Sequence, residues 1–404
     1  MSKINIYEQL AIKTDSKIIM LVMDGLGGIP LQPDGKTEME TAKTPNINKI
    51  APHSTMGLLE PVAPGVTPGS GPGHLGLFGY DPIEANIGRG VLSALGINFP
   101  LRHGDLCARV NFCTVDSTGK VTDRRAGRIP TDENKRIRDK ILASIKPPAG
   151  VELFFETEKD HRAGLILRGK KFYENIADTD PQRTGFEPLE PVADDPQKGA
   201  QTVEILKDII SQIKKILADE QKANMVLLRG FAEYKAFPSI EEKYKLKSLA
   251  LATYPMYRGL ASLIGMDVDW KISSQEEQIQ QLHKNYDKYD FFFIHIKYTD
   301  SSGEDGDFQR KVQVIEQTDA MIPHILNLKP DAFVIACDHS TPAKMKAHSW
   351  HRIPALLHSP LCRPDKLERF DETHCLRGGL NGYESKYLLP IAMAHAMKLN
   401  KFGA

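Results

Sequence analysis

The stretch from Asp331 to His351, DAFVIACDHSTPAKMKAHSWH, constrains the fold more than any other part of the chain. Ala332 to Cys337 is an unbroken apolar run, which is typical of a strand buried on both faces inside a parallel sheet. Asp338 and His339 follow where that strand would leave the sheet, and His348 follows after a short loop. Ligands of open α/β sheets bind beyond the carboxyl ends of the strands, so this pair is a candidate metal site. The alternative is an Asp that caps a helix beside a surface His.

Two other apolar runs end in carboxylates in the same way. Lys17 to Met23 ends in Asp24, and glycines that permit a tight turn follow it. Asp290 to Tyr298 is the most strand-like run in the chain, and an acidic segment follows it. In that segment, the spacing of four places Asp300 and Glu304 on one face of a helical turn. For Asp24 the alternative is an ordinary Asp-Gly turn. For the segment after Tyr298 the alternative is a solvated acidic loop. A calcium loop is disfavoured, because the acidic spacing that it requires is missing.

Pro61 to Gly73, PVAPGVTPGSGPG, excludes regular structure and leads into an apparent helix start at His74. It carries Ser70 between two glycines. A serine on a turn before a helix lies near backbone N–H groups, which is what a phosphate-accepting nucleophile requires. The alternative is a flexible loop. Upstream, Thr44 and Pro45 predict a short helix with Thr44 as its N-cap.

The middle of the chain has a different character. Candidate strands alternate with helices there, and Gln201 to Gln221 has apolar residues at helical spacing. We therefore expect an α/β fold with two parts. Residues 1–85 and 240–404 form a discontinuous metal-binding catalytic domain, and residues 86–239 form a smaller inserted α/β domain that binds substrate.

Composition excludes several classes of function. The 404 residues carry 52 Lys plus Arg against 52 Asp plus Glu. The chain therefore has no net positive charge that would attract nucleic acid or an acidic membrane surface. The five cysteines form no CxxC pair, which favours free thiols in a reducing cytoplasm. The N-terminus has no signal-peptide pattern, and no apolar run is long enough to span a membrane. We expect a cytoplasmic protein.

Together these features predict a two-metal phosphoryl-transfer site. Three strand ends supply carboxylates, one of them also supplies an imidazole, and His348 and Ser70 complete the set. This combination is too rich in oxygen and imidazole for a structural zinc site, whereas it suits two ions that neutralise phosphoryl oxygens.

The motifs that carry this chemistry are similar to those of a known family. MDGLGG, TPNINKIAPHSTMG, PGSGPGHLGLFGYDP, HIKYTDSSGEDGD and CDHSTPAKMKAHS resemble the cofactor-independent phosphoglycerate mutases, in their archaeal-type branch within the alkaline phosphatase superfamily. The resemblance covers essentially the whole chain and is most specific in the catalytic motifs. It implies an alkaline phosphatase-like, mostly parallel sheet between helices, with a smaller α/β domain inserted.

The resemblance also implies roles for individual residues. One ion would be held by Asp300, Glu304 and His348, and a second by Asp24, Asp338, His339 and the nucleophile Ser70. The family usually has histidine at position 304, so Glu304 is a departure that would shift preference toward harder ions. Asp123 is the candidate acid/base group. The implied substrate-binding residues are Arg124, Arg128, His161, Arg162, Arg229 and Lys243.

The implied reaction interconverts 3-phosphoglycerate and 2-phosphoglycerate in glycolysis and gluconeogenesis, through phosphoserine at Ser70 and without 2,3-bisphosphoglycerate. Mn²⁺ is the expected ion, with Mg²⁺, Zn²⁺ and Co²⁺ as alternatives, and domain closure would exclude water. The nearest alternative is another phosphomutase, phosphatase or phosphotransferase of the same superfamily. A metal-dependent binding protein that has lost activity ranks lower, because every central group except the usual histidine at position 304 is present.

Overall fold

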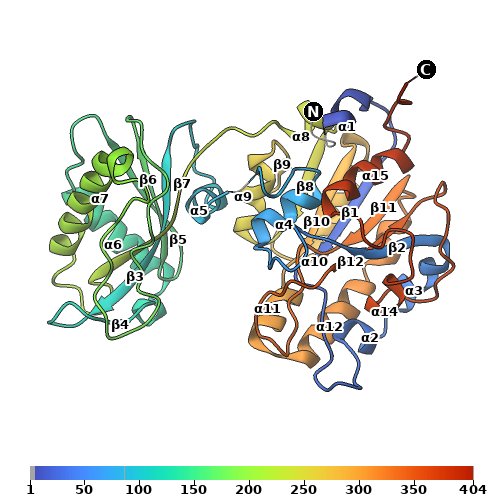
Figure 1. The fold of residues 1–404 in the computed structure, drawn as a ribbon, viewed down its shortest axis with the longest axis horizontal. Helices are drawn as coiled ribbons and strands as arrows, with labels where there is room; N and C mark the ends of the chain where they lie inside the picture. The colour runs from blue at the N-terminus through green and yellow to red at the C-terminus, as the bar shows by residue number, and fades with distance from the viewer. Residues whose placement is uncertain (1–4, 86, 404) are drawn as a thin grey trace. The chain divides into compact units, whose positions relative to one another are not determined.

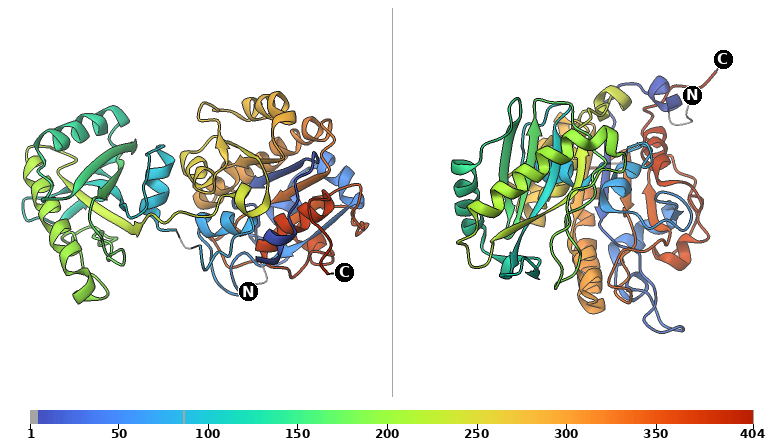
Figure 2. Two further views of the ribbon diagram at one scale, coloured as in Figure 1. Left: turned by 90° about the horizontal axis from the view of Figure 1, so that it is seen from above. Right: turned by 60° about the vertical axis from the view of Figure 1, so that its left-hand side comes forward.

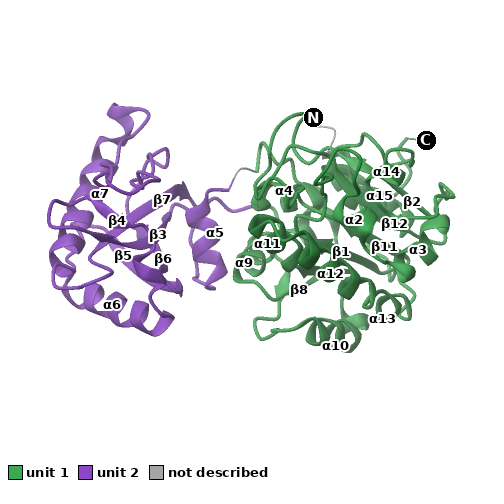
Figure 3. Ribbon diagram, turned by 90° about the horizontal axis from the view of Figure 1, so that it is seen from below, with its two compact units in different colours: residues 1–86, 238–404 green, residues 87–237 purple. Residues whose placement is uncertain are grey.

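The computed structural model describes residues 5–85 and 87–403, and the chain divides into two compact units (Figure 3). The larger unit comprises residues 1–86 and 238–404, and the inserted unit comprises residues 87–237. Within the described residues, no helix is both long enough and apolar enough to cross a membrane.

The larger unit is built on a seven-stranded sheet with β1 near its middle (Figure 1). β1 pairs in parallel with β10 on one side and β11 on the other, and β8 and β9 continue the parallel part. β12 is antiparallel to both β11 and β2. The mostly parallel sheet expected from the sequence is therefore confirmed. In sheet order the strands are β2 Ser54–Leu59, β12 Ile353–His358, β11 Ala332–Ala336, β1 Ile18–Met23, β10 Phe291–Ile296, β8 Ser248–Ala252 and β9 Asp267–Val268.

The three apolar runs recognised in the sequence are the neighbouring central strands β1, β10 and β11, and every residue in them is buried. Because the three strands run in the same direction, the polar residues that follow them lie at one edge of the sheet.

Helices cover both faces of this sheet (Figure 2). Phe293 of β10 packs edge-on against Phe78 at the end of α4, with ring centroids 4.9 Å apart. On the other face, Phe292 stacks on Tyr286 just after α10. The helices of this unit are α1 Asn5–Leu10, α2 Glu38–Thr41, α3 Pro45–Ile50, α4 Ser70–Leu77, α8 Ile240–Tyr244, α9 Pro255–Leu263, α10 Gln275–Asn285, α11 Tyr298–Asp305, α12 Phe308–Asp319, α13 Ile322–Leu326, α14 Glu372–Cys375 and α15 Leu388–His395.

The inserted unit has an antiparallel sheet with its own apolar core. β3 lies at its centre and pairs with β4, β6 and β7, and β6 pairs with β5. One face of the sheet packs against α6 and α7 around Phe112, Phe155 and Ile209. The elements are α5 Arg89–Gly96, β3 Leu106–Val115, β4 Val121–Asp123, α6 Thr131–Ser144, β5 Glu152–Lys159, β6 Arg162–Arg168, α7 Pro196–Ile216 and β7 Met225–Glu233.

Three local expectations need correction. α4 begins at Ser70, four residues before the start predicted at His74, so Ser70 is the first residue of the helix. The helix predicted over residues 201–221 is α7, which ends at Ile216, before the predicted end, and starts earlier, because Asp195 caps it and Pro196 occupies its first position. Thr44 precedes α3 as predicted, but its side chain makes no capping hydrogen bond.

Asp319, at the end of α12, caps α3 from a distance in the sequence. Its carboxylate accepts hydrogen bonds from the N–H groups of Asn46, at 3.1 Å, and Ile47, at 2.8 Å. Asp319 and Ile47 are both buried, so the N–H of Ile47 has no access to water as a substitute. The first N–H groups of α3, which have no partner within the helix, therefore couple α3 to α12 through Asp319.

We expect Asp319→Ala to reduce the free energy of unfolding of the larger unit by on the order of 1–3 kcal/mol, because it leaves buried donors without an acceptor. Thr44→Val, which preserves shape and removes a hydroxyl without a capping role, should cost clearly less. Urea unfolding of both variants followed by circular dichroism measures the difference. Equal losses would contradict the capping role of Asp319.

Candidate active site

The turns that follow β1 and β11 bring Asp24 and Asp338 together. Both carboxylates are fully buried. The N–H of Gly25 donates to Oδ1 of Asp338 over 3.2 Å, which joins the two turns directly. Gly25 has a positive φ of 64°, and a Cβ there would lie 2.5 Å from Oγ1 of Thr341. This turn therefore requires glycine.

The first turn of α4 carries Ser70 to the same place. The Ser70 hydroxyl lies 3.0 Å from Nε2 of His339, at hydrogen-bond distance. His74, one turn further along α4, has Nδ1 3.1 Å from Oδ2 of Asp338 and 2.8 Å from the carbonyl oxygen of Ser70. His74 therefore links the start of α4 to the strand exit.

Asp300 and Glu304 lie one turn apart on α11, as their spacing predicted. Oδ1 of Asp300 accepts a hydrogen bond from Oγ1 of Thr341 over 2.6 Å and lies 3.5 Å from Nε2 of His348. Glu304 lies 3.8 Å from the same nitrogen, but its side chain is 54% exposed whereas that of Asp300 is 1% exposed. Partial burial and the nearby Asp300 carboxylate together raise the pKa of Glu304.

Within residues 5–85 and 87–403, two sets of side chains have potential metal-ligand atoms within 4.8 Å of one another. One set is Asp24, Asp338 and His339, and the other is Asp300, His339 and His348. His339 belongs to both, and its ring stacks on that of His348 with centroids 3.6 Å apart. Glu304 belongs to neither set, so its role as a ligand remains a prediction.

The donor atoms suit cations. Within the described residues, neither Oδ1 of Asp24 nor Oδ2 of Asp338 accepts a hydrogen bond, although both atoms are buried. A buried carboxylate oxygen without a donor is costly unless a cation balances it. The carboxylate and imidazole atoms present here therefore fit divalent metal ions.

Besides His74, three residues that the sequence analysis did not assign contact Asp24. The Tyr257 hydroxyl donates to Oδ2 of Asp24. Nζ of Lys297 lies 3.0 Å from Oδ2 of Asp24 and 2.6 Å from Oδ2 of Asp300. His295 stacks on Tyr257 and has Nε2 3.4 Å from Oδ2 of Asp24.

A sequence signal existed for these residues. Lys297 and His295 belong to the strand end that precedes Asp300, and Tyr257 follows β8, the neighbour of β10. Polar residues that follow the carboxyl end of a parallel strand are candidates for the site. The same reasoning applied to β8 indicates Tyr257.

The electrostatics of the cluster are strongly coupled. Burial opposes ionisation of Asp338, but the His339 and His74 rings outweigh it and hold the pKa of Asp338 well below its usual range. Burial also opposes protonation of His339, but the Asp338 carboxylate outweighs it and raises the pKa of His339 to about 9. Lys297 behaves similarly, since Asp24 and Asp300 outweigh burial and raise its pKa.

The remaining predicted residues, apart from Lys243, lie in the inserted unit, and several already have partners. Arg124 forms a two-pronged ion pair with Asp180, with distances of 2.9 and 2.7 Å. Arg229 lies 3.5 Å from both Asp178 and Asp180. The carboxylate of Asp123 accepts hydrogen bonds from two backbone N–H groups of the following turn.

His161 and Arg162 lie at the turn into β6. Burial and the neighbouring guanidinium groups, Arg162 first among them, lower the pKa of His161 to about 4. Arg109 and Arg125 contribute to the same effect, so the basic cluster includes two arginines that were not assigned. Arg128 lies in the turn after β4, in the left-handed backbone region with a φ of 51°. The substrate-binding roles of these residues remain predictions.

Lys243 lies on α8 of the larger unit. Its Nζ is 2.8 Å from Glu8 and sits over the ring of Tyr80. The side chain is buried, with 8% exposed. Its predicted contact with substrate remains untested.

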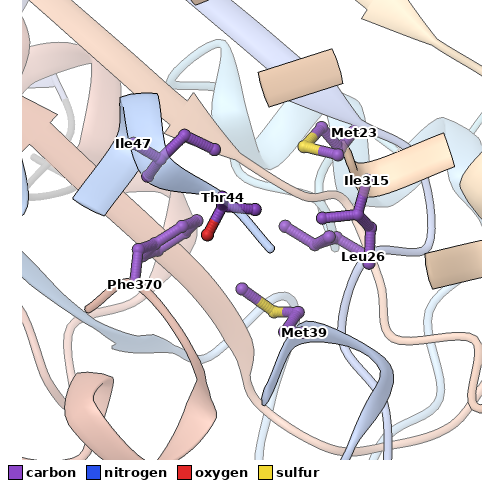
Figure 4. A pocket seen from close by; sticks show the side chains of 7 residues that line it. All are labelled: Met23, Leu26, Met39, Thr44, Ile47, Ile315 and Phe370. Carbon is purple, nitrogen blue, oxygen red and sulfur yellow. The ribbon is translucent and has the colours of Figure 1, made fainter. Parts of the chain in front are cut away.

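A small apolar cavity lies beside the exit of β1 (Figure 4). It is lined by Met23, Leu26, Met39, Thr44, Ile47, Ile315 and Phe370. The Thr44 hydroxyl is the polar side-chain group in this lining, so the cavity does not provide ligands for a metal or a phosphate.

A parallel sheet with a buried carboxylate and imidazole cluster around a serine at its carboxyl edge is the arrangement of an α/β enzyme. The sequence profile of the 2,3-bisphosphoglycerate-independent phosphoglycerate mutases matches residues 51–223. A Thermus thermophilus protein named as a probable mutase of this kind is 48% identical over 402 residues, which cover 99% of each chain. Its Aquifex aeolicus counterpart is 46% identical over 408 residues, which cover 99% of this chain and 100% of the relative.

Two solved structures extend the comparison. A Pyrococcus horikoshii protein superimposes with a TM-score of 0.82 at 27% identity, covering 97% of this chain and all of the other. A cofactor-independent phosphoglycerate mutase from Thermoplasma acidophilum gives a TM-score of 0.71 at 28% identity, covering 94% of this chain and all of the other. The chain belongs to the 2,3-bisphosphoglycerate-independent phosphoglycerate mutase family.

Gly73 provides a test of how closely α4 must approach the strand exit. A Cβ on Gly73 would lie 2.4 Å from the carbonyl oxygen of Asp338, so Gly73→Ala should displace the helix that carries Ser70. A displacement of about 1 Å can reduce a reaction rate a hundredfold, and we expect mutase activity to fall on that scale. Gly69→Ala is the matched control, because a Cβ there meets its nearest atom at 3.9 Å. Similar activity in the two variants would contradict this contact.

Proposed function

We propose that the protein interconverts 3-phosphoglycerate and 2-phosphoglycerate without 2,3-bisphosphoglycerate, through a phosphoserine at Ser70 and with two divalent metal ions. The observation that carries the proposal is the position of the Ser70 hydroxyl, at the start of α4 and 3.0 Å from Nε2 of His339. Around it lie the buried oxygens of Asp24 and Asp338 that accept no hydrogen bond from the described residues.

The residues that would hold the ions combine the two sets of donor atoms with Ser70 and Glu304, which the family resemblance adds. Asp24, Asp338, His339 and Ser70 would hold one ion, and Asp300, His348 and Glu304 would hold the other. When bound, divalent ions lower the pKa of the serine hydroxyl and neutralise phosphoryl oxygens. Mn²⁺ is our proposed ion, because carboxylate oxygens outnumber imidazole nitrogens among the proposed ligands and favour harder ions.

The residues around the site hold it in place before substrate arrives. Tyr257 and Lys297 engage Oδ2 of Asp24, which leaves Oδ1 directed at His339, 3.3 Å away. His74 similarly fixes Asp338 relative to the backbone of Ser70. The start of α4 adds backbone N–H groups, which favour the negative charge of a phosphoryl group next to Ser70.

In the proposed reaction, the Ser70 oxygen forms a bond to phosphorus as the bond to the glycerate oxygen breaks. The glycerate then turns, and its other hydroxyl takes the phosphoryl group back from Ser70. The glycerate would be held by the predicted residues of the inserted unit, namely Arg124, Arg128, His161, Arg162 and Arg229, with Lys243 of the larger unit. Exclusion of water during the turn separates a mutase from a phosphatase.

Asp123 is our candidate for the acid/base group, although its carboxylate already accepts two backbone hydrogen bonds. The five cysteines are free thiols, which agrees with the proposed location in the cytoplasm. The proposed reaction would serve glycolysis and gluconeogenesis.

Replacing Ser70 tests the proposed reaction. The parent protein loaded with Mn²⁺ should convert 3-phosphoglycerate when the assay is coupled to enolase and contains no 2,3-bisphosphoglycerate. Ser70→Ala should abolish this conversion while the protein stays folded, because it removes the hydroxyl that we propose stores the phosphoryl group. The matched control is Thr67→Ala, which removes an exposed hydroxyl of the same loop.

Mass spectrometry of the parent, quenched during turnover, should find phosphate on the peptide that contains Ser70. Isomerisation by a folded Ser70→Ala protein would overturn the serine route. Release of inorganic phosphate without isomerisation by the parent would instead identify a phosphatase.

Replacing Glu304 tests the second ion site. Glu304→His substitutes a neutral imidazole for a harder, charged ligand, so the ranking of metals should move toward Zn²⁺ and Co²⁺. The measurement is mutase activity after chelation and reloading with each metal in turn. Asp305→His makes the same chemical change at the next, exposed residue of α11 and should leave the ranking unchanged. An unaltered ranking in Glu304→His would remove Glu304 from the ligands.

A further inference from the structure

The turns that follow β1 and β11 pack against each other without intervening side chains. The N–H of Thr341 lies 3.2 Å from the carbonyl oxygen of Gly25 and 3.1 Å from that of Gly27. A Cβ on Gly27 would lie 2.1 Å from Oγ of Ser340. The two turns therefore form one packed unit, so a contact that positions one turn also positions the other.

Lys311 of α12 contacts both turns where they meet. Its Nζ donates to the carbonyl oxygens of Gly27, at 3.0 Å, and Thr341, at 2.8 Å, and so joins one turn to the other. The side chain is 0% exposed, and burial is the main reason that the pKa of Lys311 is lowered. Burying an ammonium group is costly, and such a group contributes little to stability compared with an apolar residue of similar size. Its presence here is better explained by the geometry it imposes.

Two carboxylates, the buried Glu38 and the half-buried Glu372, complete the arrangement around Lys311. Oε1 of Glu38 lies 3.8 Å from Nζ of Lys311 and accepts a hydrogen bond from the N–H of Ala343 over 2.9 Å. Oε1 of Glu372 accepts from the N–H of Gly28, also over 2.9 Å. Burial raises the pKa of Glu372 to about 7. One cation and two carboxyl groups from α12, α2 and α14 thus bind four backbone groups of the two turns.

Thr341 transmits this arrangement to the candidate metal ligands. Its backbone oxygen is held by Lys311, while its Oγ1 donates to Asp300 over 2.6 Å and lies 3.0 Å from Nδ1 of His339. His339 belongs to both candidate metal sets, and Asp300 belongs to one of them. A shift of Thr341 would therefore change the orientation of ligands in both sets.

We propose that Lys311, supported by Glu38 and Glu372, is a positioning residue that fixes the orientation of the metal-binding side chains His339 and Asp300 through Thr341. This inference rests on the proposed two-metal function, and it assigns no contact between Lys311 and substrate. Groups that orient metal ligands in this way typically change metal affinity 10- to 100-fold when they are removed.

The experiment titrates chelated protein with Co²⁺ and records its visible absorption, which reports both affinity and ligand geometry. Lys311→Met should bind Co²⁺ at least about tenfold more weakly than the parent, with altered absorption bands, while remaining folded by circular dichroism. Lys398→Met is the matched control, because Lys398 is also buried, with 1% exposed, and also donates to a carbonyl oxygen, that of Thr14. It should retain the affinity of the parent within about twofold.

The possible outcomes are distinct. Parental affinity and bands in Lys311→Met overturn the positioning role, and so does an equal loss in Lys398→Met, since that would be a general effect of removing a buried lysine. If Lys311→Met does not fold, Glu38→Gln decides the question. Its amide oxygen can still accept from Ala343, yet the partner charge of Lys311 is gone, so Co²⁺ binding should weaken, and unchanged binding overturns the proposal. Failure of the parent itself to bind Co²⁺ would count against the proposed function.

Discussion

The structure depends on the burial of three like charges at one edge of a sheet. Asp24, Asp300 and Asp338 come from three neighbouring strands, and each is almost entirely shielded from water. Such an arrangement is unfavourable unless positive groups lie among the carboxylates. Lys297, His339 and His74 supply these groups within the chain, and their contacts leave Oδ1 of Asp24 and Oδ2 of Asp338 without a hydrogen bond from the described residues. Fold, electrostatics and candidate chemistry all follow from this constraint.

Much of the larger unit could be predicted because its signals are local. The apolar runs of β1, β10 and β11 identify buried strands, and the polar residue after each strand follows without further information. The parallel direction of the strands then brings distant segments to one edge. By contrast, the sequence could not reveal Asp319 as the cap of α3, because this signal is not local. The cap comes from a helix more than 250 residues away. Thr44 has the right type and position, yet its backbone geometry does not give the capping hydrogen bond.

The residues missed by sequence analysis share one property: they act through contacts between elements. Tyr257 and Lys311 stand on amphipathic helices, where a tyrosine or a lysine is usually unremarkable. Only the three-dimensional structure shows that the first reaches Asp24 and that the second reaches the backbone of two turns. In the inserted unit the composition indicated arginine-rich turns, but it could not reveal that Arg124 is already paired with Asp180.

His339 is a member of both sets of candidate ligands, and this has a consequence for the order in which ions are acquired. A single imidazole ring cannot rotate to suit one ion without changing what it offers to the other. In the proposed two-metal site the two binding events would therefore be thermodynamically linked, and by reciprocity each ion would alter the affinity for the other by the same factor. The population of the singly loaded form would then depend on the orientation of this one ring.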